Sequence, residues 1–346
     1  MSDLFIAENY QSKLPLRETE RAIKFVKDYF QDYLAEVLNL QRVSAPLFVL
    51  KGSGVNDDLN GVERKVSFPV KAADETVAEC LFSLAKWKRM ALAEYEFQQG
   101  EGLYTDMNAI RPDEESLDNL HSIYVDQWDW ERIISGQERN LDFLKEIVRK
   151  IYRVLKNTET VVHEKYPQLT PMLPNEITFV HTEELFDEYP NLTAKERENK
   201  ALRKYGAVFL IGIGGTLPDG SIHDGRAPDY DDWTTPIGDG KNGLNGDILL
   251  WYPLLNRTFE ISSMGIRVDK DALLRQLEIR NALDKKEQLW HKRLLNDEFP
   301  LCIGGGIGQS RLCMFFLQKL HIGEVHASVW PDDVLRGCKE AGVRLL

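Results

Sequence analysis

Apolar residues recur at helical spacing near the start of the chain. Ile23, Val26, Phe30, Leu34 and Val37 lie three or four residues apart, and charged residues fill positions between them. This period predicts an amphipathic helix over residues 17–38. Because a proline cannot continue a helix, the apolar run 47–50 that follows Pro46 predicts a strand.

The later elements are shorter and more mixed. Strands are expected around residues 66–72 and 121–125, with a helix over residues 78–95 between them. Charges at helical spacing predict helices within 135–156 and 182–205, and strands broken by glycine follow residue 207. Strands at both ends with helices inserted between them predict an α+β fold on a largely antiparallel sheet. No repeat or linker marks a boundary, so we expect one domain over residues 1–346, with a helical insertion around 135–205.

Composition narrows the classes of function. The 346 residues include 43 basic and 55 acidic side chains, and the net charge of -12 disfavours a nucleic-acid partner. The four cysteines lack metal-ligand spacing and the density of a disulfide scaffold, which indicates reduced, structural thiols. The N-terminus has no signal-peptide pattern, and no apolar run reaches membrane-spanning length. We therefore expect a cytoplasmic protein without a membrane segment.

A glycine run near the C-terminus ends in an arginine. Residues 304–308 contain four glycines, which let a backbone approach a ligand closely, and Arg311 opens an apolar run typical of a buried helix. A cation at that helix entrance favours anionic oxygens. A helix-packing turn with a surface arginine is about equally consistent with this segment alone.

Residues 246–265 indicate a hairpin whose turn lies near Leu254. Folding the segment there brings Asp247 and Glu260 close to opposite each other, and oxygen ligands together with bound phosphate are the usual means of holding Mg²⁺. The sequence therefore predicts a magnesium–nucleotide site, with Arg267 adding a cation on the same side. The alternative is two solvated carboxylates on an exposed edge.

Two segments place polar side chains beside apolar ones. Strand alternation puts Gln127 and Asp129 on the face that Val125 shares, which indicates either an exposed strand tip or the polar floor of a pocket for a small zwitterion. Pro112 fixes Arg111 in an extended turn, where a guanidinium can bind a phosphate, although an isolated arginine is more often a surface charge.

Further polar groups are candidates for binding an ammonium group and a carboxylate. Residues 227–233 place Asp231 among other acids and between aromatics, residues 56–58 contain Asp57, and residues 83–89 contain Ser83 and Lys88. Acidic clusters are usually solvated, and the basic residues of 83–89 would by default be the wet face of a helix.

Two other kinds of site are disfavoured. The strand at 208–211 is followed by glycines but then by a turn at 217–220, where a dinucleotide site needs a helix. The seven histidines show no metal spacing, and no serine or cysteine nucleophile motif is present, so covalent hydrolysis is unsupported.

Taken in order, the proline-marked strand, the arginine after a loop and the glycine strand ending in arginine resemble the three motifs of class II aminoacyl-tRNA synthetases, at Pro46, Arg111 and Arg311. The runs 259–267 and 304–311 look most like the aspartyl and asparaginyl branch. The runs 83–89, 100–105, 124–131 and 227–233 resemble the ammonia-dependent asparagine synthetases, also called aspartate–ammonia ligases. The likeness extends from about residue 21 to residue 331.

The resemblance implies a class II synthetase-like sheet and a homodimer formed around Pro46. It also implies the synthesis of asparagine from aspartate, ammonia and ATP through β-aspartyl-AMP, with Mg²⁺. In that family likeness Arg111 would hold the α-phosphate, Arg311 the terminal phosphates or the adenine face, and Asp247 with Glu260 the metal. The aspartate ligands would be Asp57, Lys88, Gln127 and Asp231, with Ser83 and Asp129 as second candidates. The main rival is a true aspartyl- or asparaginyl-tRNA synthetase, but no room is expected for the anticodon-binding module that it needs. The other alternative is a noncatalytic synthetase-like regulator or binding module.

Overall fold

The computed structural model describes residues 4–56, 64–114 and 116–346. Its centre is a sheet of eight strands in the order β1-β5-β6-β13-β12-β11-β8-β7. Their bounds are β1 Leu40–Arg42, β5 Gly102–Ile110, β6 Tyr124–Ile133, β13 Cys302–Gly308, β12 Arg257–Ile266, β11 Asn245–Tyr252, β8 Ala207–Ile211 and β7 Thr178–His181. Only the two edge strands, β1 and β7, pair in parallel with their neighbours, so the prediction of a largely antiparallel sheet is confirmed.

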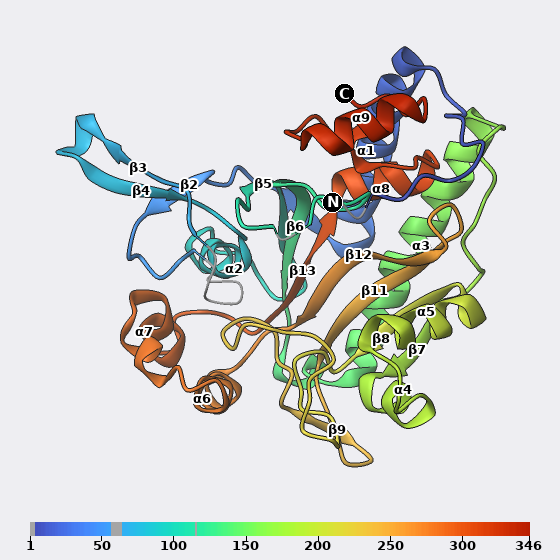
Figure 1. Cartoon of the computed structure of the whole chain (residues 1–346). Helices are drawn as coiled ribbons and strands as arrows, with labels where there is room; N and C mark the ends of the chain where they lie inside the picture. The colour runs from blue at the N-terminus through green and yellow to red at the C-terminus, as the bar shows by residue number, and fades with distance from the viewer. Residues whose placement is uncertain (1–3, 57–63, 115) are drawn as a thin grey trace.

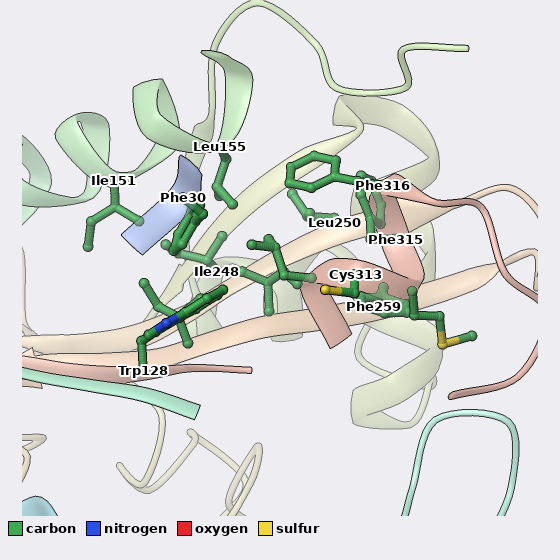
Figure 2. Close-up of a cluster of buried hydrophobic side chains, with 14 of the residues drawn as sticks. Phe30, Trp128, Ile151, Leu155, Ile248, Leu250, Phe259, Cys313, Phe315 and Phe316 are labelled. Carbon is green, nitrogen blue, oxygen red and sulfur yellow. The ribbon is translucent and has the colours of Figure 1, made fainter. Parts of the chain in front are cut away.

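Three helices cover one face of this sheet: α1 (Leu16–Leu38), α3 (Leu141–Lys165) and α8 (Gln309–Phe316). The core lies between them and the strands, where Phe30 of α1 contacts Trp128 of β6 with ring centroids 4.9 Å apart. Figure 2 shows these two rings beside Ile151 of α3 and Ile248 of β11. Because side chains alternate along a strand, Trp128 and Trp130 face this core, and Gln127 and Asp129 point to the other face.

The remaining elements surround the central sheet. A three-stranded sheet of β2 (Phe48–Leu50), β4 (Thr76–Cys80) and β3 (Ser67–Val70) projects to one side (Figure 1), followed by α2 (Ala85–Glu94). Helices α4 (Thr182–Glu188) and α5 (Ala194–Tyr205) lie near β7 and β8, and α6 (Lys270–Ile279) and α7 (Leu289–Leu295) lie below α2 in the same view. The chain ends with α9 (Asp332–Glu340), and β9 (Pro236–Gly238) pairs with β10 (Lys241–Asn242) in a small ribbon. Within the described ranges, no helix combines the length and apolar character that crossing a membrane requires.

The predicted helix over 17–38 is confirmed as α1. It ends where Asn39 adopts a left-handed conformation, with φ at 56°, and β1 follows at once. The predicted helix over 78–95 is wrong at its start, because residues 76–80 form β4 and the helix begins only at Ala85. The strand expected over 121–125 begins at Tyr124 and runs on to Ile133, because Trp128 and Trp130 extend its buried face.

Candidate active site

A cavity of about 810 Å³ opens on the sheet face that α1, α3 and α8 leave uncovered. Nine of the eleven predicted site residues line it: Ser83, Lys88, Arg111, Gln127, Asp129, Asp231, Glu260, Arg267 and Arg311. Asp247 contacts the cavity-lining Arg226, and Asp57 lies outside the described residues. The fold thus brings together side chains that are up to 228 positions apart in the chain, from Ser83 to Arg311.

A buried network of five charged side chains lies along one part of the cavity, and four of them line it: Lys88, Asp129, Asp231 and Arg267. Lys88 Nζ lies 3.2 Å from Asp129 Oδ2 and 3.7 Å from Glu131 Oε2. Arg267 donates from Nε and Nη2 to the two oxygens of Glu131 at 2.8 Å each, and its Nη1 donates to Asp231. All five side chains are buried. The basic residues 86, 88 and 89 are therefore not the wet face of a helix, because each of them is buried too.

This network holds three carboxylates against two cations and so carries one unbalanced negative charge. Burial raises the pKa of Asp231, even though the Arg267 guanidinium opposes the rise. Burial also acts to raise the pKa of Glu131, but the Arg267 guanidinium and the Lys88 ammonium hold it below its usual value. Asp129 Oδ1 is buried and has no hydrogen-bond partner among the described residues. A negative site with a free buried acceptor favours a ligand that brings an ammonium group.

The floor beside the network is the glycine strand β13. A Cβ atom on Gly304 would lie 2.1 Å from Glu131 Oε2, and one on Gly306 would lie 2.3 Å from Gln127 Oε1. The carbonyl of Gly305 accepts a hydrogen bond of 3.0 Å from Lys88 Nζ. Glycine at these positions therefore leaves the space that the polar side chains of β6 occupy.

The predicted arginines line the same cavity. The chain passes directly from β13 into α8, and Arg311 is the third residue of that helix. Arg311 Nη1 donates to the carbonyl of Glu260 at 3.1 Å and lies 3.7 Å from Glu260 Oε2. Arg111 follows β5 and donates from Nη2 to the carbonyl of Phe82 at 3.2 Å, while its buried Nε has no hydrogen-bond partner among the described residues. Both guanidiniums keep capacity for an anionic ligand.

The predicted register of the hairpin is wrong by a small amount. Glu260 pairs with Leu249 and Asp247 pairs with Ser263, because a bulge lies between Ile248 and Leu249. The two carboxylates are therefore diagonal neighbours instead of direct partners. The Asp247 and Glu260 carboxylates nevertheless interact with each other. Burial and the Glu260 carboxylate raise the pKa of Asp247 to about 6, with Arg226 opposing the rise.

A Mg²⁺ ion would find a partial set of ligands here. No group of three or more metal-binding side chains occurs among residues 4–56, 64–114 and 116–346. Two carboxylates that repel each other do suit a dication, and Mg²⁺ commonly takes one or two carboxylates together with substrate phosphates. Arg226 Nη2 donates to both oxygens of Asp247 at 2.5 and 2.6 Å, so Glu260 is the more available of the two.

Three residues of the cavity region were given no role by the sequence reasoning. Glu131 continues the alternation of Gln127 and Asp129, so the strand period could have found it. His121 lines the cavity, with Nδ1 held 2.7 Å from Asp118 Oδ1. Neither His121 nor Arg226 shows a local signal, because each lies in a loop and the partner of Arg226 is distant in sequence.

Solved structures with a similar fold are class II aminoacyl-tRNA synthetases. The asparaginyl-tRNA synthetase of Pyrococcus horikoshii, solved with asparaginyl-adenylate, matches with a TM-score of 0.67 at 18% identity, over 96% of this chain and 77% of that chain. The aspartyl-tRNA synthetase of Entamoeba histolytica matches with a TM-score of 0.60 at 15% identity, over 90% of this chain and 59% of that one. The predicted class II synthetase-like fold is confirmed.

Curated relatives align along the whole sequence. An aspartate–ammonia ligase of Parabacteroides distasonis and one of Clostridium perfringens are each 58% identical over 346 residues, which is 100% of this chain and 100% of each relative. A family model described as aspartate-ammonia ligase matches residues 17–342, so the likeness continues past residue 331 into α9. The chain belongs to the aspartate–ammonia ligase family.

Proposed function

We propose that the protein is a ligase that makes asparagine from aspartate, ammonia and ATP, through a β-aspartyl-AMP intermediate, with release of AMP and pyrophosphate. Family membership supports the overall reaction. The observation that carries the proposal at the site is the cavity that joins an acidic, buried network to two arginines with free donors. The acidic network suits the ammonium group of an amino acid, and the arginines suit the phosphates of a nucleoside triphosphate.

The buried network is the proposed aspartate end. Asp231 and the free oxygen of Asp129 face the α-ammonium group, and the unbalanced negative charge of the network favours that cation. Lys88 and Gln127 contact the carboxylates of the substrate, and Ser83 lines the same cavity. Because Arg267 is held by Glu131 and Asp231, we now assign it to this end and not to the ATP. Asp57 stays a prediction.

The two arginines form the proposed ATP end. Arg111 holds the α-phosphate, and Arg311 the terminal phosphates or the adenine face, with His121 as an additional candidate for a phosphate contact. A carboxylate oxygen of aspartate attacks the α-phosphorus, the bond from that phosphorus to the bridging oxygen breaks, and pyrophosphate leaves. The guanidiniums neutralise charge that spreads over the phosphate oxygens in this step.

Ammonia then attacks the acyl carbon, the bond from that carbon to the AMP oxygen breaks, AMP leaves, and the nitrogen releases a proton to the solvent. The cavity holds the attacking carboxylate oxygen against the α-phosphorus, so positioning supplies much of the rate. Mg²⁺, held by Glu260 and Asp247, would neutralise phosphate charge when it is bound. Four further points stay predictions: the metal, the homodimer formed around Pro46, the single domain over 1–346 with its insertion around 135–205, and the cytoplasmic location.

The first test is an exchange measurement. Replacing Arg111→Ala should sharply reduce aspartate-dependent exchange of pyrophosphate into ATP, because the α-phosphate loses its charge partner. Arg203→Ala is the matched control, since Arg203 is an exposed arginine of α5 that donates to Asn256 Oδ1 and does not line the cavity. Near-normal exchange in Arg111→Ala would remove this arginine from the site.

The second test concerns the nitrogen donor. Purified protein given aspartate and ATP should form asparagine with ammonium chloride and should not form it with glutamine alone. Product formation with glutamine alone, or binding of aspartate and ATP without any product, would contradict the proposed reaction.

Sedimentation equilibrium measures the oligomeric state, and a mass of twice 39.8 kDa is expected for the homodimer.

A further inference from the structure

The loop 227–233, which carries Asp231, is fastened by side chains that lie outside the cavity. Gln276 of α6 donates from Nε2 to the carbonyls of Pro228 and Asp231 at 2.9 and 3.0 Å, and its Oε1 accepts from the Trp233 N–H at 2.9 Å. Gln276 is buried and does not appear among the residues that line the cavity. These bonds fix the path of the loop backbone.

A second anchor of the same loop is charged. Asp229 Oδ2 lies 2.9 Å from Lys86 Nζ of α2 and 3.0 Å from His291 Nε2 of α7. The three side chains are 1%, 2% and 0% exposed, respectively. Burial acts to raise the pKa of Asp229, but the Lys86 ammonium and the His291 contact hold it well below its usual value. The anchor is therefore an ion pair enclosed by protein.

Two residues of the anchor each stand two positions before a residue that lines the cavity. Lys86 precedes Lys88 by two positions on α2, and Asp229 precedes Asp231 by two positions in the loop. Because positions two apart on a helix point in nearly opposite directions, Lys88 faces the cavity while Lys86 faces the anchor. Lys86 Nζ also donates to the carbonyl of Asn56 at 3.4 Å. Asn56 is the last described residue before Asp57.

A structural role alone would not require charges at this place. Replacing a buried ion pair by apolar residues of similar volume is often neutral or stabilising, whereas a hydrogen-bonded pair sets the distance between two segments narrowly. The Lys86–Asp229 pair joins the segments that carry the proposed aspartate ligands. A buried ion pair of this kind is better suited to fixing the distance between the two segments than to stabilising the fold.

We propose that Lys86, Asp229 and His291 are positioning residues that set the spacing between Lys88 and Asp231 at the aspartate end. The inference rests on the proposed assignment of that end. It predicts that a change in this anchor weakens the use of aspartate and leaves the use of ATP unchanged, because the arginines that line the ATP end belong to other segments.

His291→Phe and His291→Gln form the main test, because both leave the Lys86–Asp229 pair in place. The glutamine retains a donor near the position of Nε2, and the phenylalanine does not. We expect His291→Phe to raise the KM for aspartate roughly tenfold or more, given how strongly misplacement of about 1 Å affects a site. The KM for ATP should stay within about twofold of wild type, and His291→Gln should lie near wild type for both substrates.

Lys86→Met is the second variant, with Lys292→Met as its control, since Lys292 is an exposed lysine of α7. The inference is overturned if folded His291→Phe and Lys86→Met keep a wild-type KM for aspartate, or if both KM values rise together in step with lost thermal stability. Lys88→Met tests the underlying assignment in the same assay. A wild-type aspartate KM in Lys88→Met would refute the aspartate end itself, and the inference with it.

Discussion

Replacing Glu131 by glutamine should destabilise the folded protein by about 3 kcal/mol. Removing one partner of a buried ion pair typically costs about 3–5 kcal/mol. Glutamine keeps one oxygen for Arg267, but its amide nitrogen then faces a guanidinium N–H, and one unpaired buried donor costs about 1–3 kcal/mol. The variant also leaves two cations facing two carboxylates, Asp129 and Asp231, so no uncompensated charge remains. These two effects together place the expected loss at the lower end of the range.

The loss is measurable by urea unfolding followed by tryptophan fluorescence, since Trp128 and Trp130 are buried in the same strand. The midpoint should fall while the slope of unfolding free energy against urea concentration stays the same. Glu94→Gln is the control, because Glu94 is 49% exposed and pairs with Arg293 at the surface. That exposed pair should be worth less than about 1 kcal/mol.

The reasoning would be refuted by a Glu131→Gln protein whose free energy of unfolding falls by no more than that of Glu94→Gln. Such a result would mean that the Arg267 guanidinium finds new acceptors without cost.

Three further changes have defined outcomes. The Asp247 carboxyl has a pKa of about 6 in the folded protein and 3.8 ordinarily, so the folded protein loses stability as the pH rises between those two values. Glu260→Gln should reduce this loss, measured as the fall of the urea midpoint with pH, because the Glu260 carboxylate helps to raise the pKa. An unchanged loss would contradict the interaction between Glu260 and Asp247. Gly306→Ala would place a Cβ atom 2.3 Å from Gln127 Oε1. The KM for aspartate should therefore rise roughly tenfold, while the KM for ATP stays within about twofold of wild type. Equal changes in both KM values would argue against β13 as the floor of the aspartate end. Phe30→Ala removes a fully buried ring from the core and should cost about 3–5 kcal/mol in urea unfolding, with a loss under about 1 kcal/mol showing that the helix–sheet packing is misjudged.

The periodicity of apolar residues predicted the elements whose structure is set by residues close together in the sequence. The period of α1 and the alternation that separates Gln127 from Trp128 are properties of single segments, and both are present in the structure. The helix that Arg311 enters was predicted from its apolar run, whereas the glycine strand before it was expected only from the resemblance to class II synthetases.

Features that depend on partners distant in sequence were missed or misplaced. Lys86 and Lys88 look like a solvated helix face until Asp229 and Asp129 are brought to them, because burial of a lysine requires a partner that no local pattern reveals. The bulge at Ile248 shifts the hairpin register by one residue without any glycine or proline at that point. Arg226 pairs with a carboxylate 21 positions away and gave no signal at all.

The glycines of β13 also determine how this enzyme could be altered to accept another substrate. At Gly304 and Gly306 every possible replacement adds volume where polar side chains already stand, so these positions offer a protein engineer no useful variants. The adjustable part of the cavity is its wall, where Ser83 and Gln127 contribute side chains that can be shortened or lengthened. A library for a ligase that accepts a longer or shorter acidic amino acid should therefore vary the wall and keep the glycine strand constant.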